Sequence, residues 1–164
     1  MLNLYRVVTN GIHWPPDSHS WRHEGRISQV SVPESGASVV EIRISARPAL
    51  IPTVRAVASD LAGRADFDLD AISDLRMAVD EACTTLVGLS ANHGTLSCRF
   101  VLQAEQIEVV VSTPTPAPGA EVRTDSFGWR VLQTLADEVS TVHGVDGVPD
   151  ALAIRLIKHV GATK

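Results

Sequence analysis

The sequence is poor in three features, and each of them narrows the class of protein. It has only two cysteines, Cys83 and Cys98, without C-x-x-C spacing, so we expect buried free thiols rather than a redox pair. No run approaches the roughly 18 consecutive apolar residues that a membrane-spanning helix needs. There is also no excess of positive charge: the formal net charge is -5, which argues against nucleic acid as the main ligand.

The N-terminal stretch differs from the rest of the chain. Residues 1–37 show no clear periodicity, and they lack the basic leader and sustained apolar core of a signal peptide. We therefore expect a poorly structured extension over 1–37, a folded domain over 38–164 and a cytoplasmic location.

From residue 39 onward, strand and helix patterns follow one another. Alternation of apolar and polar residues predicts strands, and apolar residues at 3–4 spacing predict helices. In chain order these are a strand over 39–46, helices over 49–65 and 70–89, strands over 95–102 and 106–112, a helix over 127–142 and a strand over 151–159. This order predicts an α+β fold: a two-layer sandwich with a mixed, mostly antiparallel sheet and helices on one face.

The predicted helix over 70–89 carries polar residues beside its apolar stripe. Glu81 and Thr85 lie one turn apart, on the shoulder of the face that the stripe buries. A carboxylate in that position can polarise a hydroxyl or a water, or reach a metal ion through a water. Periodicity alone equally allows a solvated acidic face, because amphipathic helices commonly have one.

Two segments resemble motifs of one family. "DLRMAVDEACTTLV" resembles the N box of the GHKL, or Bergerat-type, ATPases, in particular their anti-sigma-factor serine kinase branch. "DSFGWRVLQTLADEV" resembles the helix that begins with the family's second glycine box, and the loop over 113–126 occupies the position of its ATP lid. The resemblance covers about residues 39–160 and implies the histidine-kinase-like ATPase fold.

The resemblance implies roles for three residues of a nucleotide site. Glu81 matches the general base, Gly128 the second glycine box, and Thr85 the asparagine that coordinates Mg²⁺. A threonine hydroxyl is a weaker ligand for a hard cation than an amide carbonyl. The first glycine box, expected within "VSTPTPAPGAEV", lacks the aspartate that binds adenine. We therefore expect binding of ATP and Mg²⁺ to be weak, altered or lost.

The resemblance also implies partners. An anti-sigma factor of this branch sequesters an alternative sigma factor of the stress or sporulation type, and an anti-anti-sigma factor competes with it. Arg55 best matches the arginine that faces the sigma factor, although a solvated arginine fits the pattern equally well. Family members are commonly homodimers. Two other interpretations stay open: an active serine/threonine kinase that phosphorylates the anti-anti-sigma factor, and an ATPase-like scaffold with a non-sigma partner.

Overall fold

The structure is a computed structural model that describes residues 37–91, 94–114, 119–145 and 148–161. The expected N-terminal extension lies outside the described residues except for Ala37, and so does part of the expected lid, residues 115–118.

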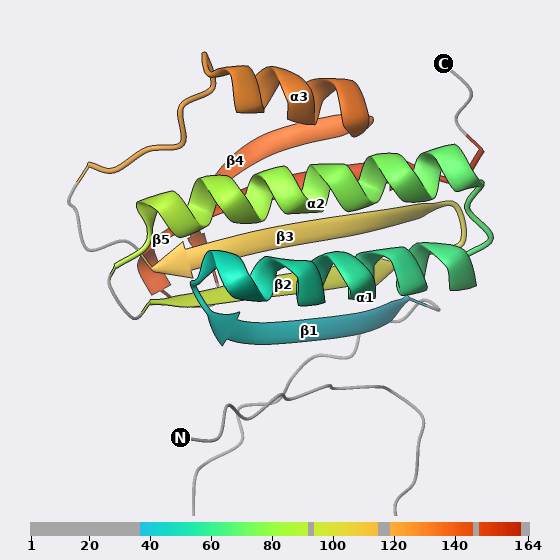
Figure 1. Cartoon of the computed structure of the whole chain (residues 1–164), viewed down its shortest axis with the longest axis horizontal. Coiled ribbons are helices and arrows are strands. Elements are labelled where there is room, and N and C mark those ends of the chain that lie inside the picture. Colours follow the sequence, from blue (N-terminus) through green and yellow to red (C-terminus); the bar gives the residue numbers. More distant parts are fainter. Residues whose placement is uncertain (1–36, 92–93, 115–118, 146–147, 162–164) are drawn as a thin grey trace, which may run out of the picture.

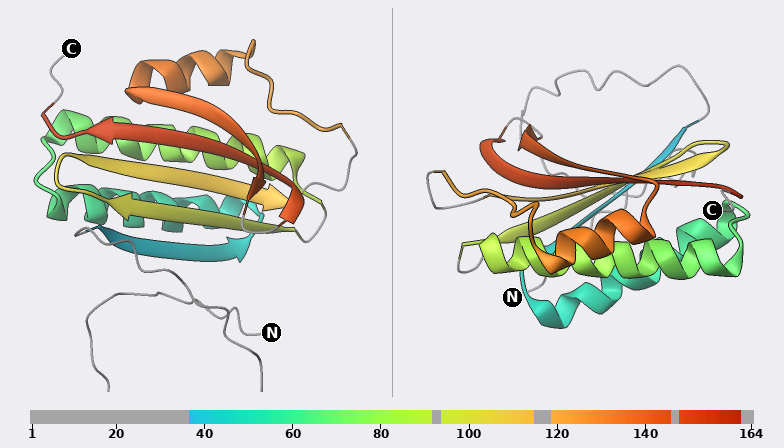
Figure 2. Two further views of the ribbon diagram at one scale, coloured as in Figure 1. Left: turned by 180° about the vertical axis from the view of Figure 1, so that it is seen from behind. Right: turned by 90° about the horizontal axis from the view of Figure 1, so that it is seen from above.

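The described residues form two layers, a five-stranded sheet and three α-helices. The strand order is β1-β2-β3-β5-β4, and every pairing of neighbouring strands is antiparallel. The strands are β1 (Ser38–Ser45), β2 (Thr95–Leu102), β3 (Gln106–Pro114), β4 (Glu138–Val145) and β5 (Val148–His159). The helices are α1 (Ile51–Arg64), preceded by a short 3-10 turn at Pro48–Leu50, α2 (Leu69–Leu89) and α3 (Phe127–Leu135). All three α-helices lie on one face of the sheet (Figure 1, Figure 2), which confirms the predicted α+β sandwich. The described sheet is antiparallel throughout, whereas the sequence predicts a mixed, mostly antiparallel sheet.

Helix α2 lies between α1 and α3 and carries the N-box-like segment (Figure 1). The side chain of Asp68 caps its first turn by accepting a hydrogen bond of 2.7 Å from the backbone N–H of Ala71. Its buried residues recur at 3–4 spacing and face the sheet: Ala71, Leu75, Ala78, Val79, Ala82, Cys83 and Leu86. None of the described helices is long and apolar enough to span a membrane.

The prediction of one helix over 127–142 is wrong in its second half. Helix α3 ends at Leu135, and Glu138–Val145 is strand β4, which pairs with β5. The 3–4 spacing that includes Val139 and Val142 therefore does not mark a continuous helical face. These β-branched residues favour a strand, and the hairpin with β5 supplies the backbone hydrogen bonds that a longer helix would have made internally.

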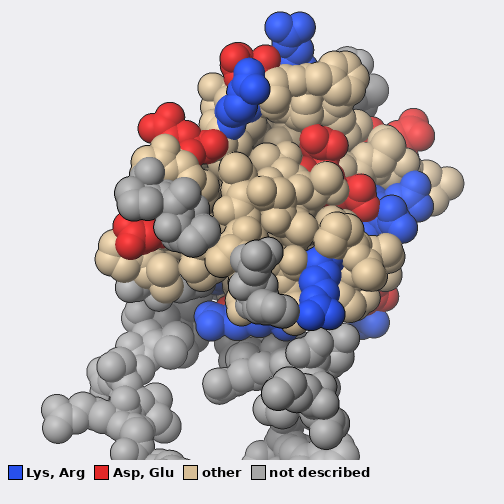
Figure 3. All heavy atoms as spheres, turned by 60° about the vertical axis from the view of Figure 1, so that its left-hand side comes forward, with Lys and Arg blue, Asp and Glu red and all other residues tan. Residues whose placement is uncertain are grey.

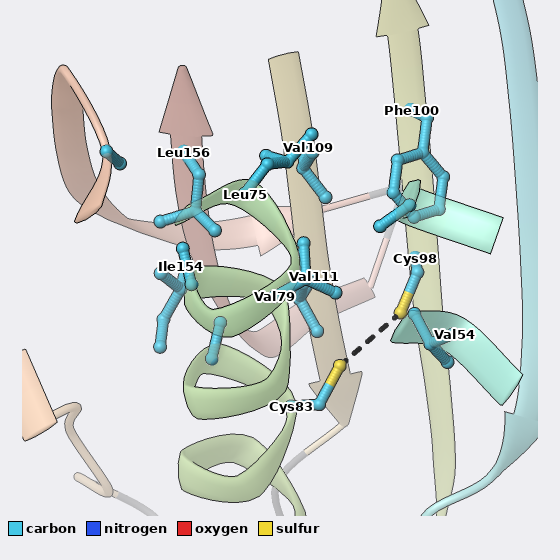
Figure 4. Close-up of a cluster of buried hydrophobic side chains, with 14 of the residues drawn as sticks. Val54, Leu75, Val79, Cys83, Cys98, Phe100, Val109, Val111, Ile154 and Leu156 are labelled. Atoms are coloured by element: carbon cyan, nitrogen blue, oxygen red, sulfur yellow. Dashed lines mark hydrogen bonds between the residues drawn. The ribbon is translucent and has the colours of Figure 1, made fainter. Parts of the chain in front are cut away.

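The two cysteines lie in the core between α2 and β2 (Figure 4). Both are fully buried, and their Sγ atoms are 4.0 Å apart. Cys83 and Cys98 are therefore free, buried thiols, as the composition predicts. They belong to the same hydrophobic core cluster as Phe100, Val109 and Leu156 of the sheet.

Candidate functional site

The structure brings Glu81 and Gly128 together. Glu81 lies in the middle of α2 and is half-buried, while Gly128 lies in the first turn of α3. A methyl group on Gly128 would overlap Oε1 of Glu81 and lie 3.1 Å from its Cδ. Glycine is therefore the residue that allows the start of α3 to approach this carboxylate so closely.

The start of α3 is fixed by a cap. Ser126 accepts a hydrogen bond of 3.1 Å from the backbone N–H of Trp129 and donates one of 2.9 Å to the carbonyl of Arg123. The indole of Trp129 is buried in the core. The cap and the buried indole together hold the first turn of α3, and with it Gly128, in place beside Glu81.

Thr85 lies one turn beyond Glu81 on α2 and is half-buried. The two residues share one side of the helix, because four residues advance a helix by little more than one turn. Thr85 is the neighbour of Leu86, which is fully buried. The structure thus confirms the predicted helical placement of Glu81 and Thr85 beside the buried stripe, whereas the roles of these residues stay predictions.

A groove of about 570 Å³ crosses the outer side of the helical layer. It contains Arg55 of α1 and Glu81 of α2, the two residues for which the sequence predicts partner binding and catalysis. The lining residues are Arg55, Arg76, Met77, Asp80, Glu81, Val131 and Leu135. We call this depression the helical groove. The residue predicted to bind the partner and the residue predicted to act in catalysis therefore line the same groove.

Arg55 is held in the helical groove by an ion pair. Its Nη1 lies 2.9 Å from Oδ1 of Asp80, and both side chains are partly exposed, by 42% and 39%. Such a pair contributes about 0–1 kcal/mol to stability, so the guanidinium can exchange its partner at little cost. Arg55 is thus oriented by Asp80 rather than freely solvated.

The side of the molecule shown in Figure 3 carries surface charges of both signs. In Figure 3, where the left-hand side of Figure 1 comes forward, uncharged surface is broad and acidic and basic side chains are dispersed around it. The helical groove follows the same pattern, since Met77, Val131 and Leu135 accompany two arginines and two carboxylates. As a binding partner, a protein whose surface has both apolar and charged groups matches this groove better than a polyanion such as nucleic acid does.

The residues present fit a Mg²⁺–nucleotide in part. Mg²⁺ in such sites is typically held by one or two carboxylates together with phosphate oxygens, and Glu81 and Thr85 offer a carboxylate and a hydroxyl on one side of α2. Among the described residues, no group of three or more His, Cys, Asp or Glu could hold a metal ion. The close approach of Glu81 to Gly128 also fills space between α2 and α3.

Two partners within this region were missed by sequence reasoning. Asp80 orients Arg55, and Lys158 of β5 forms an ion pair with Asp74 of α2. A signal for Lys158 was available, because it follows Ile154 and Leu156 in the alternation of the last strand and so falls on the inward face. No sequence signal pairs Asp80 with Arg55, which are 25 residues apart.

Comparison with known proteins identifies the family. The sequence model of the histidine kinase-like ATPase domain matches residues 44–158. The chain belongs to the histidine kinase-like ATPase family, and membership of an ATPase family implies a site for ATP, generally with Mg²⁺.

Its relatives include proteins of the anti-sigma and serine kinase branch, as the two motifs predict. Anti-sigma-F factor RsbW of Mycobacterium tuberculosis is 36% identical over 111 residues, which are 67% of this chain and 65% of that protein. Serine-protein kinase RsbW of Bacillus velezensis is 37% identical over 133 residues, 69% of this chain and 82% of that protein. Serine-protein kinase RsbW of Bacillus subtilis is 32% identical over 126 residues, with shares of 65% and 79%. The chain thus spans slightly less than two thirds of the mycobacterial relative.

Proposed function

We propose that this protein is a cytoplasmic anti-sigma factor that sequesters an alternative sigma factor of the stress or sporulation type. An anti-anti-sigma factor releases the sigma factor by competing for the same surface. The observation that carries this proposal is the helical groove, in which Arg55 stands beside the Glu81 of a nucleotide-type motif. The names of the RsbW relatives support it.

In this proposal Arg55 is the polar anchor of the interface. Its guanidinium presents a planar fork of donors that matches a carboxylate of the partner. Asp80 holds that fork in place before binding and shares it afterwards. Met77 and Val131 supply the apolar contacts beside it. The partner is a protein, and binding involves no direct contact with nucleic acid or membrane.

The proposal includes serine kinase activity that is weak or lost. Thr85 occupies the position of the family's Mg²⁺-binding asparagine, and the Glu81 carboxylate lies against Gly128. ATP would supply the phosphoryl group when bound, and Glu81 would take the proton from the hydroxyl that attacks it. An active kinase that phosphorylates the anti-anti-sigma factor is the second candidate, because Glu81 and Gly128 do meet.

The first experiment is recovery of the tagged protein from the cells that express it, with bound proteins identified by mass spectrometry. We expect an alternative sigma factor, with or without a small anti-anti-sigma protein, under unstressed growth. Recovery of another protein and no sigma factor, under both stressed and unstressed growth, would contradict the proposal and favour an ATPase-like scaffold.

A second experiment separates binding from catalysis. The recovered anti-anti-sigma protein is incubated with ATP, Mg²⁺ and either the natural chain or Glu81→Gln, and phosphorylation is followed by intact mass. We expect little or no transfer with either protein. Stoichiometric transfer that disappears with Glu81→Gln would establish the kinase instead.

A further inference from the structure

Lys158 is the only charged residue that is buried among those the structure describes. Its Nζ donates a hydrogen bond of 3.0 Å to Oδ2 of Asp74 on α2, and another of 3.0 Å to the backbone carbonyl of Leu135. Burying an ammonium group is costly unless it is paired and hydrogen-bonded, so both contacts are needed to keep it there. Lys158 therefore joins three elements, β5, α2 and α3, at one point.

The contact with Leu135 places a positive charge at the C-terminal end of α3. Leu135 is the last residue of this nine-residue helix, and its carbonyl belongs to the last turn, where carbonyls have no partner within the helix. A cation favours this end of a helix because of the helix dipole. A helix this short is marginal by itself, so such an external contact contributes much of what holds it.

Each end of helix α3 is thus linked to α2. Near its C-terminus, Leu135 is joined through Lys158 to Asp74; near its N-terminus, Gly128 lies against Glu81. The two helices run antiparallel (Figure 1), and each pair of contact residues is seven positions apart, about two helical turns. The two contacts therefore have the same spacing on both helices, so fixing one of them sets the position of the other.

We propose that Lys158, together with Asp74, is a positioning residue for the Glu81–Gly128 site. The buried ammonium fixes the C-terminal end of α3 on α2, and this attachment sets where Gly128 stands relative to the Glu81 carboxylate. This inference rests on the proposed function only for the ligand, because the attachment itself can be measured without one.

The test compares Lys158→Met with a control that removes a cation and its ion pair from another element. In Arg64→Met the lost pair, 2.8 Å from Arg64 Nε to Asp60 Oδ2, lies on α1, outside the helical groove and the Glu81–Gly128 site. Hydrogen exchange of the backbone amides is measured first. We expect the amides of α3 to exchange at least about tenfold faster in Lys158→Met, with β2 and β3 unchanged, and no such change in Arg64→Met.

The second measurement is the affinity for a fluorescent ATP analogue with Mg²⁺. We expect a loss of about tenfold in Lys158→Met, in the range found for residues that orient a site without touching its ligand. Arg64→Met should bind like the natural chain. If Lys158→Met does not fold, Asp74→Asn is used in its place. This substitution keeps the size of the side chain and removes only the negative charge that pairs with Lys158.

Each outcome decides a different point. Unchanged exchange of α3 in the variant overturns the attachment. Faster exchange with unchanged nucleotide affinity overturns the positioning role and leaves a structural one. Absence of nucleotide binding in the natural chain overturns the link to a nucleotide, whereas the anti-sigma function is judged separately by recovery of the sigma factor.

Discussion

At the scale of single residues, a substitution of Arg55 is expected to affect partner binding much more than stability. Its ion pair with Asp80 is half-exposed, so we expect Arg55→Ala to lower the free energy of unfolding by less than about 1 kcal/mol. If Arg55 anchors the sigma factor, the same change should weaken binding by about 2 kcal/mol or more, roughly 30-fold. Titration calorimetry with the recovered sigma factor and urea unfolding measure the two effects.

The control for this prediction lies on the same helix. Arg64 also forms an ion pair four residues away, with Asp60 at 2.8 Å, but it is 73% exposed and outside the helical groove. Arg64→Ala should leave binding unchanged. Equal losses of affinity in both variants would show that net charge, rather than the position of Arg55, governs binding.

Gly128 allows a test of the contact at the candidate site. Replacing glycine by alanine in a helix usually stabilises it by about 1 kcal/mol. Here the new methyl group must displace the Glu81 carboxylate, which offsets that gain. We therefore expect Gly128→Ala to be stabilising only when combined with Glu81→Ala, with a coupling energy of about 1 kcal/mol by urea unfolding. Additivity within about 0.5 kcal/mol would show that the two side chains do not meet in solution.

The buried contact between the two cysteines leads us to expect that the stability of the protein depends on pH. The hydrogen bond with Cys83, and then burial, raise the pKa of the Cys98 thiol well above its ordinary value of 9.0. The unfolded chain therefore loses this proton at lower pH than the folded one. The contribution of the thiol to stability is fully present below pH 9.0 and is lost as the pH rises toward the folded pKa.

Urea unfolding between pH 8 and 10.5 measures this effect. The stability of the natural chain should fall above pH 9 by up to about 1.4 kcal/mol per pH unit more steeply than that of Cys98→Ala. Parallel curves for the two proteins would contradict a raised pKa in the folded state.

At the scale of elements, α3 is the short helix on which the candidate site depends. The cap by Ser126 satisfies the N–H of Trp129 at 3.1 Å, and losing such a cap costs about 1 kcal/mol. We expect Ser126→Ala to speed exchange of the first amides of α3, whereas Ser126→Thr, which keeps both the donor and the acceptor, should not. Equal exchange in both variants would show that the buried Trp129 alone holds this turn.

The elements also show what the sequence does and does not specify. Strand β2 has the predicted bounds because its alternation is regular and its partners are sequence neighbours through the hairpin. Helix α2 begins within one residue of its prediction, at its acidic cap. The sequence predicts a helix in place of β4 because Val139 and Val142 satisfy helical spacing. The segment is a strand because it pairs with β5, which follows it in the chain.

The candidate site was predicted to a similar extent. Placing Glu81 beside the buried stripe of α2 needs only helical periodicity, which is local. The contact of Glu81 with Gly128 and the pair of Arg55 with Asp80 join different elements, so they depend on how the helices pack. Sequence periodicity carries no information about that packing.

At the scale of the whole molecule, the sheet has one face that no described element covers (Figure 2). A row across this face runs from Arg99 of β2 through Val110 of β3 to Arg155 of β5, and a groove of about 330 Å³ lies there. Antiparallel sheets can expose one face to water, but Val110, Val142 and Val145 add apolar surface to this groove. We propose that a second copy of the chain covers this face, which gives the expected homodimer.

A charge placed at the centre of that row tests the dimer. Val110→Arg sets a third arginine between Arg99 and Arg155, and two copies of this face would then repel each other. We expect sedimentation analysis to give twice the chain mass for the natural protein and the chain mass for Val110→Arg, with its circular dichroism unchanged. Thr53→Arg, on the exposed side of α1, adds the same charge away from the sheet and should stay dimeric. A natural chain that sediments as a monomer would contradict the proposal, and a Val110→Arg dimer would move the interface to the edges formed by β1 and β4.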